Sequence, residues 1–192
     1  MIFRVFVVLA TLGLAALSPT VAFAQDDGSK ITAKMRQLDL LNQILPVLMT
    51  PQQINKILPA IEKSRQADKK QLAHELEEMK KIEPKLDAAL KDAREKNLVP
   101  SKEFQLEVIA LLKKLQKERA IMILEQNEAV MKAVEETLDD GQIKAAANAI
   151  TIPDENNEKL QDRARLSRWV RAVLMDPQAY DLLVELSRKP GG

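Results

Sequence analysis

The sequence predicts an all-α protein, built as a long antiparallel helical hairpin with shorter flanking helices and a C-terminal helical pair. Apolar residues recur every three or four positions almost everywhere after Ser29, and no stretch alternates convincingly with period two. Two similar segments, 49–54 and 138–143, each have the pattern of a helix start. A turn-forming segment at 97–101 separates the two longest periodic stretches. Together these observations predict helices that reverse direction at defined corners.

Both repeated segments predict a helix that starts with a capping box. In the first segment, Thr50 can accept a hydrogen bond from the first turn, and Gln53 can reach back to the N–H of Thr50. Asp139 and Gln142 occupy the same positions in the second segment. Apolar pairs that can form a hydrophobic staple flank the boxes: Met49 with Ile54, and Leu138 with Ile143. The repeat therefore indicates two sharp corners of one helical body.

The first 24 residues have the features of a cleavable signal peptide. Arg4 supplies a positive charge, residues 5–17 form an apolar run, and residues 22–24 (Ala-Phe-Ala) match a small-x-small cleavage site. The run is too short to span a bilayer comfortably, which favours cleavage after Ala24 over an uncleaved anchor. The chain has no cysteine, which excludes a lipoprotein. We therefore expect a periplasmic or secreted protein that starts near Gln25 and has no integral membrane segment after processing.

The composition excludes several classes of function. The chain has 29 basic and 28 acidic residues, so removal of Arg4 with the signal peptide leaves 28 of each sign. A neutral protein lacks the long-range field that nucleic-acid binding usually exploits. Aromatic residues make up 3% of the chain, which argues against a sugar-binding or base-stacking surface. Without disulfides, the stability of the fold must come from packing.

The first two helices are expected at residues 31–49 and 51–97. The apolar stripe of the first consists of Met35, Leu38, Leu41, Ile44, Leu45 and Leu48, and Pro46 kinks its end. The second has a coiled-coil-like seam of Leu72, Leu76, Met79, Ile82, Leu86, Leu90 and Ala93. Bends are expected at Pro59 and Pro84. We expect this seam to face the helix that follows.

A third helix is expected from the cap at Ser101 to about Leu138. Its apolar positions are Phe104, Val108, Leu111, Leu115, Met122, Val130 and Val134. A short turn between two long helices predicts an antiparallel hairpin. Counting outward from the turn pairs Ala93 with Phe104, Leu90 with Val108, and Leu86 with Leu111.

The remaining chain predicts a fourth helix at 140–150, a linker at 151–157, and helices at 158–175 and 177–188. Three segments are therefore expected. Residues 1–24 form the signal peptide, residues 25–150 form the hairpin domain with both corners, and residues 151–192 form a C-terminal helical extension.

At its two corners the chain resembles the Spy/CpxP-like family of periplasmic proteins, whose hallmark is an LTxxQ sequence that occurs twice. The first copy has Met49 in place of Leu, and the second has Asp139 in place of Thr. Both substitutions keep an apolar staple residue followed by a side chain that can cap. The resemblance covers residues 31–150. It implies an all-helical cradle that dimerises and binds unfolded proteins without ATP, in envelope-stress or metal-stress responses.

Few residues suggest chemistry. His74 and Glu78 lie one helical turn apart and could contribute two metal ligands, but a stable zinc site usually needs three or four. A solvent-facing histidine in a charged helix is the alternative. A catalytic triad could be assembled only around His74, which sits in a highly charged surface run, and five glycines form no phosphate-binding loop. We expect a protein that is not an enzyme and needs no cofactor.

The C-terminal segment offers a candidate contact surface. Arg165, Arg168 and Arg171 surround Trp169 on a predicted helix with an apolar stripe. Such a helix could lie on anionic lipid or bind a partner protein. Alternatively, Trp169 and the stripe dock on the hairpin and leave the arginines in water.

The leading hypothesis is an exported, ATP-independent chaperone-like or stress-response protein that captures apolar segments of unfolded proteins on a helical cradle. The alternative is a structural or interaction protein whose hairpin forms a coiled coil with a fixed partner. A metal-sensing protein ranks third.

Overall fold

The computed structural model describes residues 19–150 and 162–188, and this part is entirely helical, as predicted. The elements are α1 (Pro19–Ile44), the 3₁₀ turn η1 (Leu45–Val47), α2 (Pro51–Lys96), α3 (Lys102–Glu135), α4 (Asp140–Asn148), α5 (Asp162–Trp169), the π-helical turn η3 (Val170–Leu174) and α6 (Ala179–Ser187).

The chain forms two compact units, residues 1–36 and residues 37–192, and the boundary between them falls within α1. In the first unit, the described residues belong to α1, which starts at Pro19. Ala24, the expected end of the signal peptide, therefore lies inside this helix. The predicted apolar run at 5–17 lies outside the described residues. The hairpin, the hydrophobic core and the C-terminal helices belong to the second unit.

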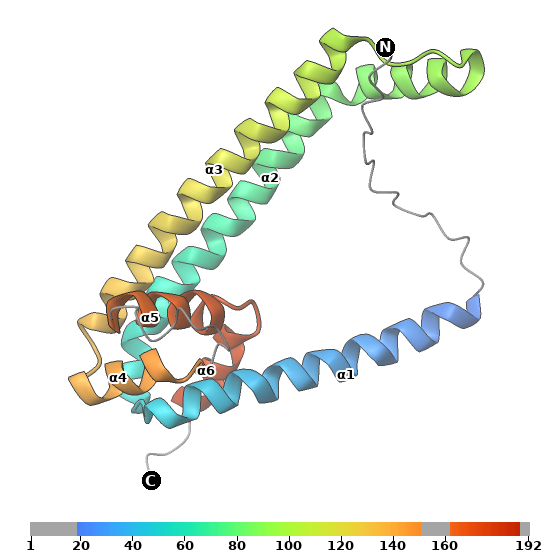
Figure 1. The fold of residues 1–192 in the computed structure, drawn as a ribbon. Coiled ribbons are helices and arrows are strands. Elements are labelled where there is room, and N and C mark those ends of the chain that lie inside the picture. The colour runs from blue at the N-terminus through green and yellow to red at the C-terminus, as the bar shows by residue number, and fades with distance from the viewer. Residues whose placement is uncertain (1–18, 151–161, 189–192) are drawn as a thin grey trace, which may run out of the picture. The chain divides into compact units, whose positions relative to one another are not determined.

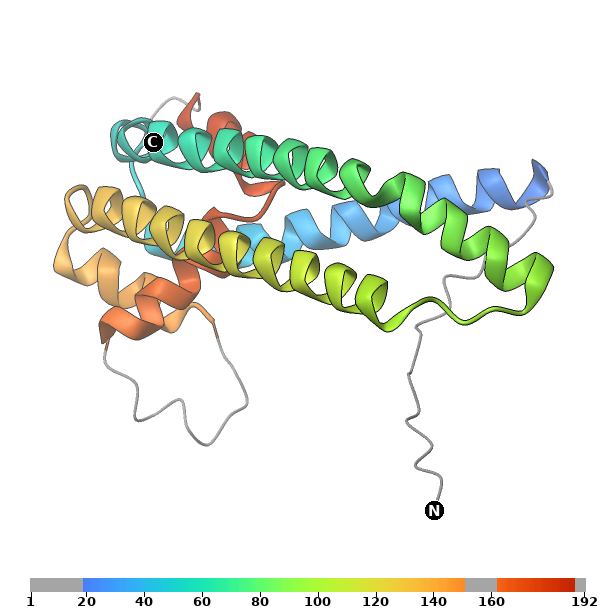
Figure 2. The same ribbon diagram turned by 90° about the horizontal axis from the view of Figure 1, so that it is seen from above.

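α2 and α3 form the antiparallel hairpin that the sequence predicts. The two helices, of 46 and 34 residues, lie side by side over much of their length (Figures 1 and 2). Asn97 ends α2 in the left-handed conformation, with φ 53°. Ser101 starts α3, and its Oγ accepts a hydrogen bond from the N–H of Phe104 at 3.2 Å. We refer to the part of the hairpin beyond about residue 70 of α2 as the arm.

The hydrophobic core lies at the base of the hairpin, where the C-terminal helices pack against it (Figure 1). Its buried residues come from six stretches of the second unit: Leu40, Ile44 and Val47; Ile54, Ile57, Leu58 and Ile61; Val130, Met131, Val134 and Leu138; Ala146 and Ala147; Leu166, Trp169, Val170, Val173 and Leu174; and Ala179, Leu182 and Leu183. The predicted C-terminal extension therefore shares one core with the hairpin.

The prediction for the first helix is wrong at both ends. α1 starts before residue 31, and it ends at Ile44, not at Met49. Pro46 lies in η1, where it lacks the N–H that a continuing α-helix would need. Leu48 then takes the left-handed conformation, with φ 53°. The buried stripe consists of Leu40, Ile44 and Val47, whereas Met35, Leu38, Leu45 and Leu48 are exposed.

The C-terminal helices were predicted in the right order but with different bounds. The helix expected at 158–175 is observed as α5, from Asp162, followed by the wider turn η3. The last helix starts at Ala179, because Asp176 first caps a turn by accepting a hydrogen bond from the N–H of Gln178 at 2.9 Å. The expected linker at 151–157 and the last residues of the chain lie outside the described residues.

Candidate functional site

Both predicted capping boxes are present. In the first, the Oγ1 of Thr50 accepts from the N–H of Gln53 at 3.2 Å, and the Oε1 of Gln53 accepts from the N–H of Thr50 at 2.9 Å. The second box repeats this arrangement with Asp139 and Gln142, at 2.8 and 3.2 Å. Each box satisfies two backbone groups that a helix start would otherwise leave without a partner.

The two corners also meet, which the sequence did not predict. The side-chain amides of Gln53 and Gln142 bond to each other in both directions, at 2.8 and 3.1 Å. Each Nε2 also donates to a backbone carbonyl of the opposite corner. Gln53 donates to Thr137 at 3.2 Å, and Gln142 donates to Leu48 at 3.1 Å. We refer to Gln53 and Gln142 as the glutamine pair.

The glutamine pair joins chain segments 89 positions apart and closes the base of the hairpin. Each glutamine caps its own helix with Oε1 and holds the opposite corner with Nε2. A carboxylate could perform only the first task, because it has no proton to donate. The spacing of the boxes is readable in the sequence, but their contact depends on how α2 and α3 return to the same end.

Along the arm, the face of α2 that meets α3 is largely polar. Glu75 is the clearest example, because its side chain is only 6% exposed. The guanidinium of Arg119 bonds to both of its oxygens, with Nε 2.9 Å from Oε1. About one turn beyond Glu75, Glu78 accepts from Lys114 at 2.8 Å and also from Lys81. A buried carboxylate needs such partners, since an unpaired charge there would be strongly destabilising.

The prediction that the seam of α2 packs against α3 is therefore wrong for most of its residues. The buried or half-buried residues of α2 on the arm are Gln71, Glu75, Glu78, Ile82, Ala89, Asp92 and Ala93, of which Ile82 and Ala93 belong to the predicted seam. Five apolar residues of the seam lie about a quarter turn away and are 42–59% exposed: Leu72, Leu76, Met79, Leu86 and Leu90. Together with Glu83, which occupies the same face between Met79 and Leu86, we call these residues the α2 row.

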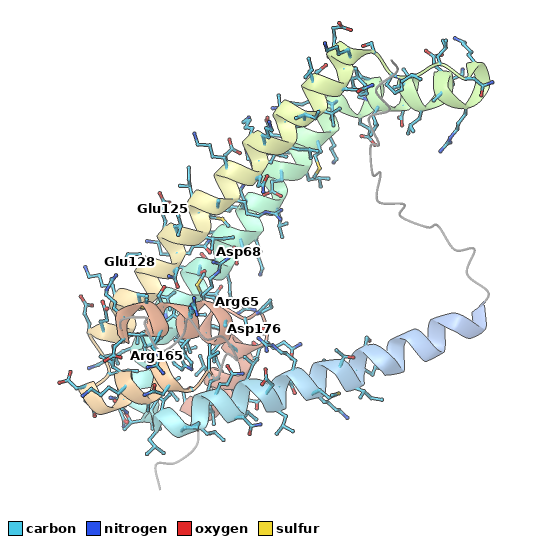
Figure 3. The ribbon with its side chains drawn as sticks, in the orientation of Figure 1. Arg65, Asp68, Glu125, Glu128, Arg165 and Asp176 are labelled. Carbon is cyan, nitrogen blue, oxygen red and sulfur yellow. The ribbon has the colours of Figure 1, made fainter. Side chains whose placement is uncertain are left out.

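The reason lies nearer the base, where one face of α2 contacts α3 and another face contacts α6. Ser64 faces α3, because its Oγ donates to Gln126 at 2.9 Å. Arg65 faces α6, because its Cζ lies 4.3 Å from the centroid of the Tyr180 ring (Figure 3). Leu72 and Leu76 are seven and eleven residues beyond Arg65, which places them on the α6 side of α2. The α2 row therefore continues a face that α6 covers only at the base.

The predicted register of the hairpin is also wrong. The Nζ of Lys85 bonds to both carboxylate oxygens of Glu107, at 2.7 and 2.9 Å. Counting outward from the turn would instead place Leu112 near Lys85. The Glu78–Lys114 pair shows the same offset. The partner of each α2 residue thus lies about one helical turn nearer the start of α3 than predicted.

The offset arises at the tip of the hairpin. Residues 97–101 form an open loop, not a tight turn, and α2 turns away from α3 near its C-terminal end (Figures 1 and 2). Pro84, which lies inside this part of α2, removes one backbone donor and favours such a bend. The last residues of α2 therefore add length at the tip without pairing closely with α3.

The carboxylates inside the arm make its stability depend on pH. The hydrogen bond from Arg119 lowers the pKa of Glu75, and hydrogen bonds from Lys114 and Lys81 lower the pKa of Glu78 from 4.5 to about 2. Groups with a lowered pKa stabilise the fold above their ordinary pKa, and this contribution is lost as the pH falls. We expect the thermal midpoint to fall steeply between pH 4.5 and pH 2.

Other carboxylates also titrate in that range, so a variant is needed for comparison. The double variant Glu75→Gln/Glu78→Gln should have a lower midpoint than the wild type at pH 6, and the difference should shrink towards pH 2. Circular dichroism melts at half-unit pH steps measure both curves. A difference that stays constant over the whole range would show that the two groups do not titrate with a lowered pKa.

α3 exposes large apolar residues as well, and the sequence analysis did not single them out. Leu106, Ile109, Leu112, Ile121 and Leu124 are 46–67% exposed, and we call them the α3 surface. At 100° per residue they point in several directions between residues 106 and 124 of α3, not along one line. Charged residues such as Lys113 and Lys117 lie between them. They occupy other positions of α3 than the predicted core stripe. In that stripe, Leu115, Val130 and Val134 are buried.

The histidine lies on the arm and is half-exposed. The Nε2 of His74 is 3.3 Å from an oxygen of Glu118 on α3. Glu78, its expected partner in a metal site, is instead bound by Lys81 and Lys114. Among the described residues, no three histidine or carboxylate side chains are grouped so that they could hold a metal ion.

Trp169, which the sequence placed at the centre of a candidate contact surface, is completely buried. Its Nε1 donates to the backbone carbonyl of Gln43 at 3.2 Å. Arg165 bonds to the side chain of Asn148, while Arg168 and Arg171 lie at the surface. The helix thus docks through its tryptophan, which is the alternative stated above. No helix in the described part of the chain combines the length and apolarity needed to cross a membrane.

Comparisons with protein-family models, with curated proteins and with solved structures found no match to this chain.

Proposed function

We propose that this chain is an exported, ATP-independent protein-binding module of the chaperone or stress-response type, which captures apolar segments of unfolded proteins on its arm. The observation that carries the proposal is the α3 surface. Exposure of large apolar side chains to water is unfavourable, and their accumulation on one helix is typical of a surface that binds other proteins. We assign client capture to this surface.

The arrangement of the α3 surface suits clients that differ in sequence. Its apolar residues point in several directions, so no single geometry of the bound segment is required. The lysines between them keep the surface hydrated and limit the apolar area that any one client buries. Weak binding of this kind allows release without ATP. Export and the resemblance at the two corners are consistent with a role in the cell envelope, and both remain part of the proposal.

An aggregation assay tests client capture. The protein should suppress the aggregation of thermally unfolded citrate synthase at a few-fold molar excess, followed by light scattering. The triple variant Leu106→Ser/Leu112→Ser/Leu124→Ser should need about tenfold more protein for half-suppression, because ~1.4 kcal/mol of lost apolar contact corresponds to that factor.

The matched control is Lys102→Ser/Lys113→Ser/Lys117→Ser, which changes three exposed residues of the same helix without removing a large apolar group. It should suppress aggregation at least as well as the wild type, because it removes no apolar contact and the lysines only limit the area that a client buries. The proposal is wrong if the wild type does not suppress aggregation, or if the leucine and lysine variants lose activity equally.

A second function is favoured by the α2 row. Its members recur at alternating steps of four and three residues, as in the seam of a coiled coil. Such regular spacing suits one helical partner held in one register, and not a changing set of clients. This is the interaction-protein alternative. The two functions use different helices of the arm, apart from Leu112 of the α3 surface, which borders the α2 row.

A further inference from the structure

The α2 row has the spacing and the surroundings of a surface that receives a helix. Its six members follow one another at steps of 4, 3, 4, 3 and 4 residues, which keeps them on one face of α2. A groove of about 390 Å³ lies between the row and α3, with Val108 and Leu111 in its other wall. At the base, α6 covers the same face of α2, and its Tyr180 packs against Arg65. A helix is therefore the kind of segment that this face accepts.

Glu83 is the one charged member of the α2 row, and it lines the groove. Within the part of the chain that the structure describes, its carboxylate has neither an ion-pair partner nor a hydrogen-bond donor. The carboxylates that face α3 differ, because Glu75 is bound by Arg119 and Glu78 is bound by Lys114. Glu83 is therefore available to a group brought by whatever covers the row.

Lys80 lies on the same side of α2, but it does not neutralise Glu83. It also lines the groove and precedes Glu83 by three residues, yet no ion pair joins these two among the described residues. Lysine before glutamate is the less favourable order of an ion pair within a helix. The long stem of Lys80 lets its ammonium reach water beside a covering helix, whereas the shorter Glu83 would be enclosed. Glu83 is thus the residue that needs a new partner.

The charge of Glu83 restricts what can cover the row. A segment that encloses the carboxylate with apolar atoms removes it from water without compensation, which is strongly unfavourable. A lysine or arginine at the facing position compensates for the lost water by a charge-assisted hydrogen bond. An acidic residue there adds repulsion between like charges. The row therefore accepts a partner by one charge as well as by its apolar seam.

We propose that the α2 row binds an amphipathic helix of another protein, and that Glu83 selects helices with a lysine or arginine near the middle of their apolar seam. The inference rests on the second function above, for which it names the kind of partner. It does not depend on client capture by the α3 surface. The leucines of the row supply the apolar contact, and Glu83 determines which helix is bound and in which register.

Synthetic helical peptides test this selection. Each peptide carries leucine at six seam positions with the spacing of the row, except that one position holds lysine or glutamate. The spacing reads the same in both directions, so two pairs of peptides are needed. The charge is at the fourth position in one pair, to face Glu83 in parallel orientation, and at the third position in the other, for antiparallel orientation. Fluorescence anisotropy of labelled peptides at nanomolar concentration, titrated with the protein, gives each dissociation constant.

In one of the two pairs, the lysine peptide should bind about tenfold more tightly than the glutamate peptide. Glu83→Lys should reverse this preference in the same pair. Because Glu83 is exposed and has no partner in the described part of the chain, the variant should keep its helical circular dichroism. The matched control is Glu77→Lys, which makes the same change at an exposed position of α2 outside the row. It should retain the preference of the wild type.

Three results would overturn the inference. Peptide binding without a charge preference, or with a preference that survives Glu83→Lys, would refute the role of Glu83 and leave the coiled-coil function standing. No binding of any peptide would refute both. A wild type with the mass of a dimer in sedimentation equilibrium, which the peptides convert to a monomer, would assign the row to a second copy of the chain. The aggregation assay tests client capture separately.

Discussion

Replacing Trp169 with alanine is expected to lower the free energy of unfolding by about 3–5 kcal/mol, the usual cost of removing a large aromatic side chain from a core. Trp169 is completely buried and is among the largest buried side chains of the protein. Its ring nitrogen also donates to the carbonyl of Gln43, so the substitution leaves this part-buried carbonyl without that partner. The effect should be large because this residue joins the C-terminal helices to the end of α1.

Two variants separate packing from hydrogen bonding at this position. Trp169→Phe keeps much of the ring and loses the donor, so it should cost less than Trp169→Ala. Arg171→Ala, two residues on and exposed, should change stability by no more than about 0.5 kcal/mol. Urea unfolding followed by circular dichroism measures all three, since the chain has one tryptophan and its fluorescence is lost in the variants. A stability of Trp169→Ala near that of the wild type would contradict the observed docking of α5.

Breaking the glutamine pair should have the second-largest effect. Gln53→Ala removes a cap, one backbone contact and both bonds to Gln142, and it should cost about 2–4 kcal/mol if each of these hydrogen bonds contributes ~0.5–1 kcal/mol. Gln142→Ala removes the equivalent set. Because the two amides bond to each other, the double variant should cost less than the sum of the single ones.

Gln53→Glu distinguishes the pair from the capping box. A glutamate can still accept from the N–H of Thr50, so the box is retained. It can still accept from the Nε2 of Gln142, but it cannot donate to Thr137 or to Gln142. Its second oxygen would face two acceptors, the carbonyl of Thr137 and the Oε1 of Gln142. We expect Gln53→Glu to be destabilised by at least about 1 kcal/mol, measured by urea unfolding at pH 7. Wild-type stability of this variant would mean that the contact between the corners contributes nothing.

The helix starts could be predicted because they depend on local chemistry. A cap, an amide three residues later and two flanking apolar residues act within one helical turn. Segments 49–54 and 138–143 therefore each contain all the residues needed to predict a helix start. The same holds for the hairpin, whose two long helices are separated by the break at 97–101. The helical predictions for α2 and α3 were therefore correct within a few residues.

The rotation of α2 could not be predicted in the same way. The periodicity of the α2 row showed that a seam existed, but not which helix would cover it. That depended on the base, where α2 packs against both α3 and α6 and its orientation is set by the contacts of Ser64 and Arg65. Since no proline interrupts α2 between Ser64 and Leu76, those contacts turned Glu75 towards α3 and left Leu76 half-exposed.

By itself the sequence determined that this protein is helical, where the two helices with capping boxes begin, and that its longest helices fold back on each other. Tertiary structure alone decided that the two corners bond to each other, that Trp169 is core and not surface, and that a leucine row remains uncovered. The physical reason is range: a cap is satisfied within one turn of its own helix, whereas burial depends on which distant segment occupies the neighbouring space.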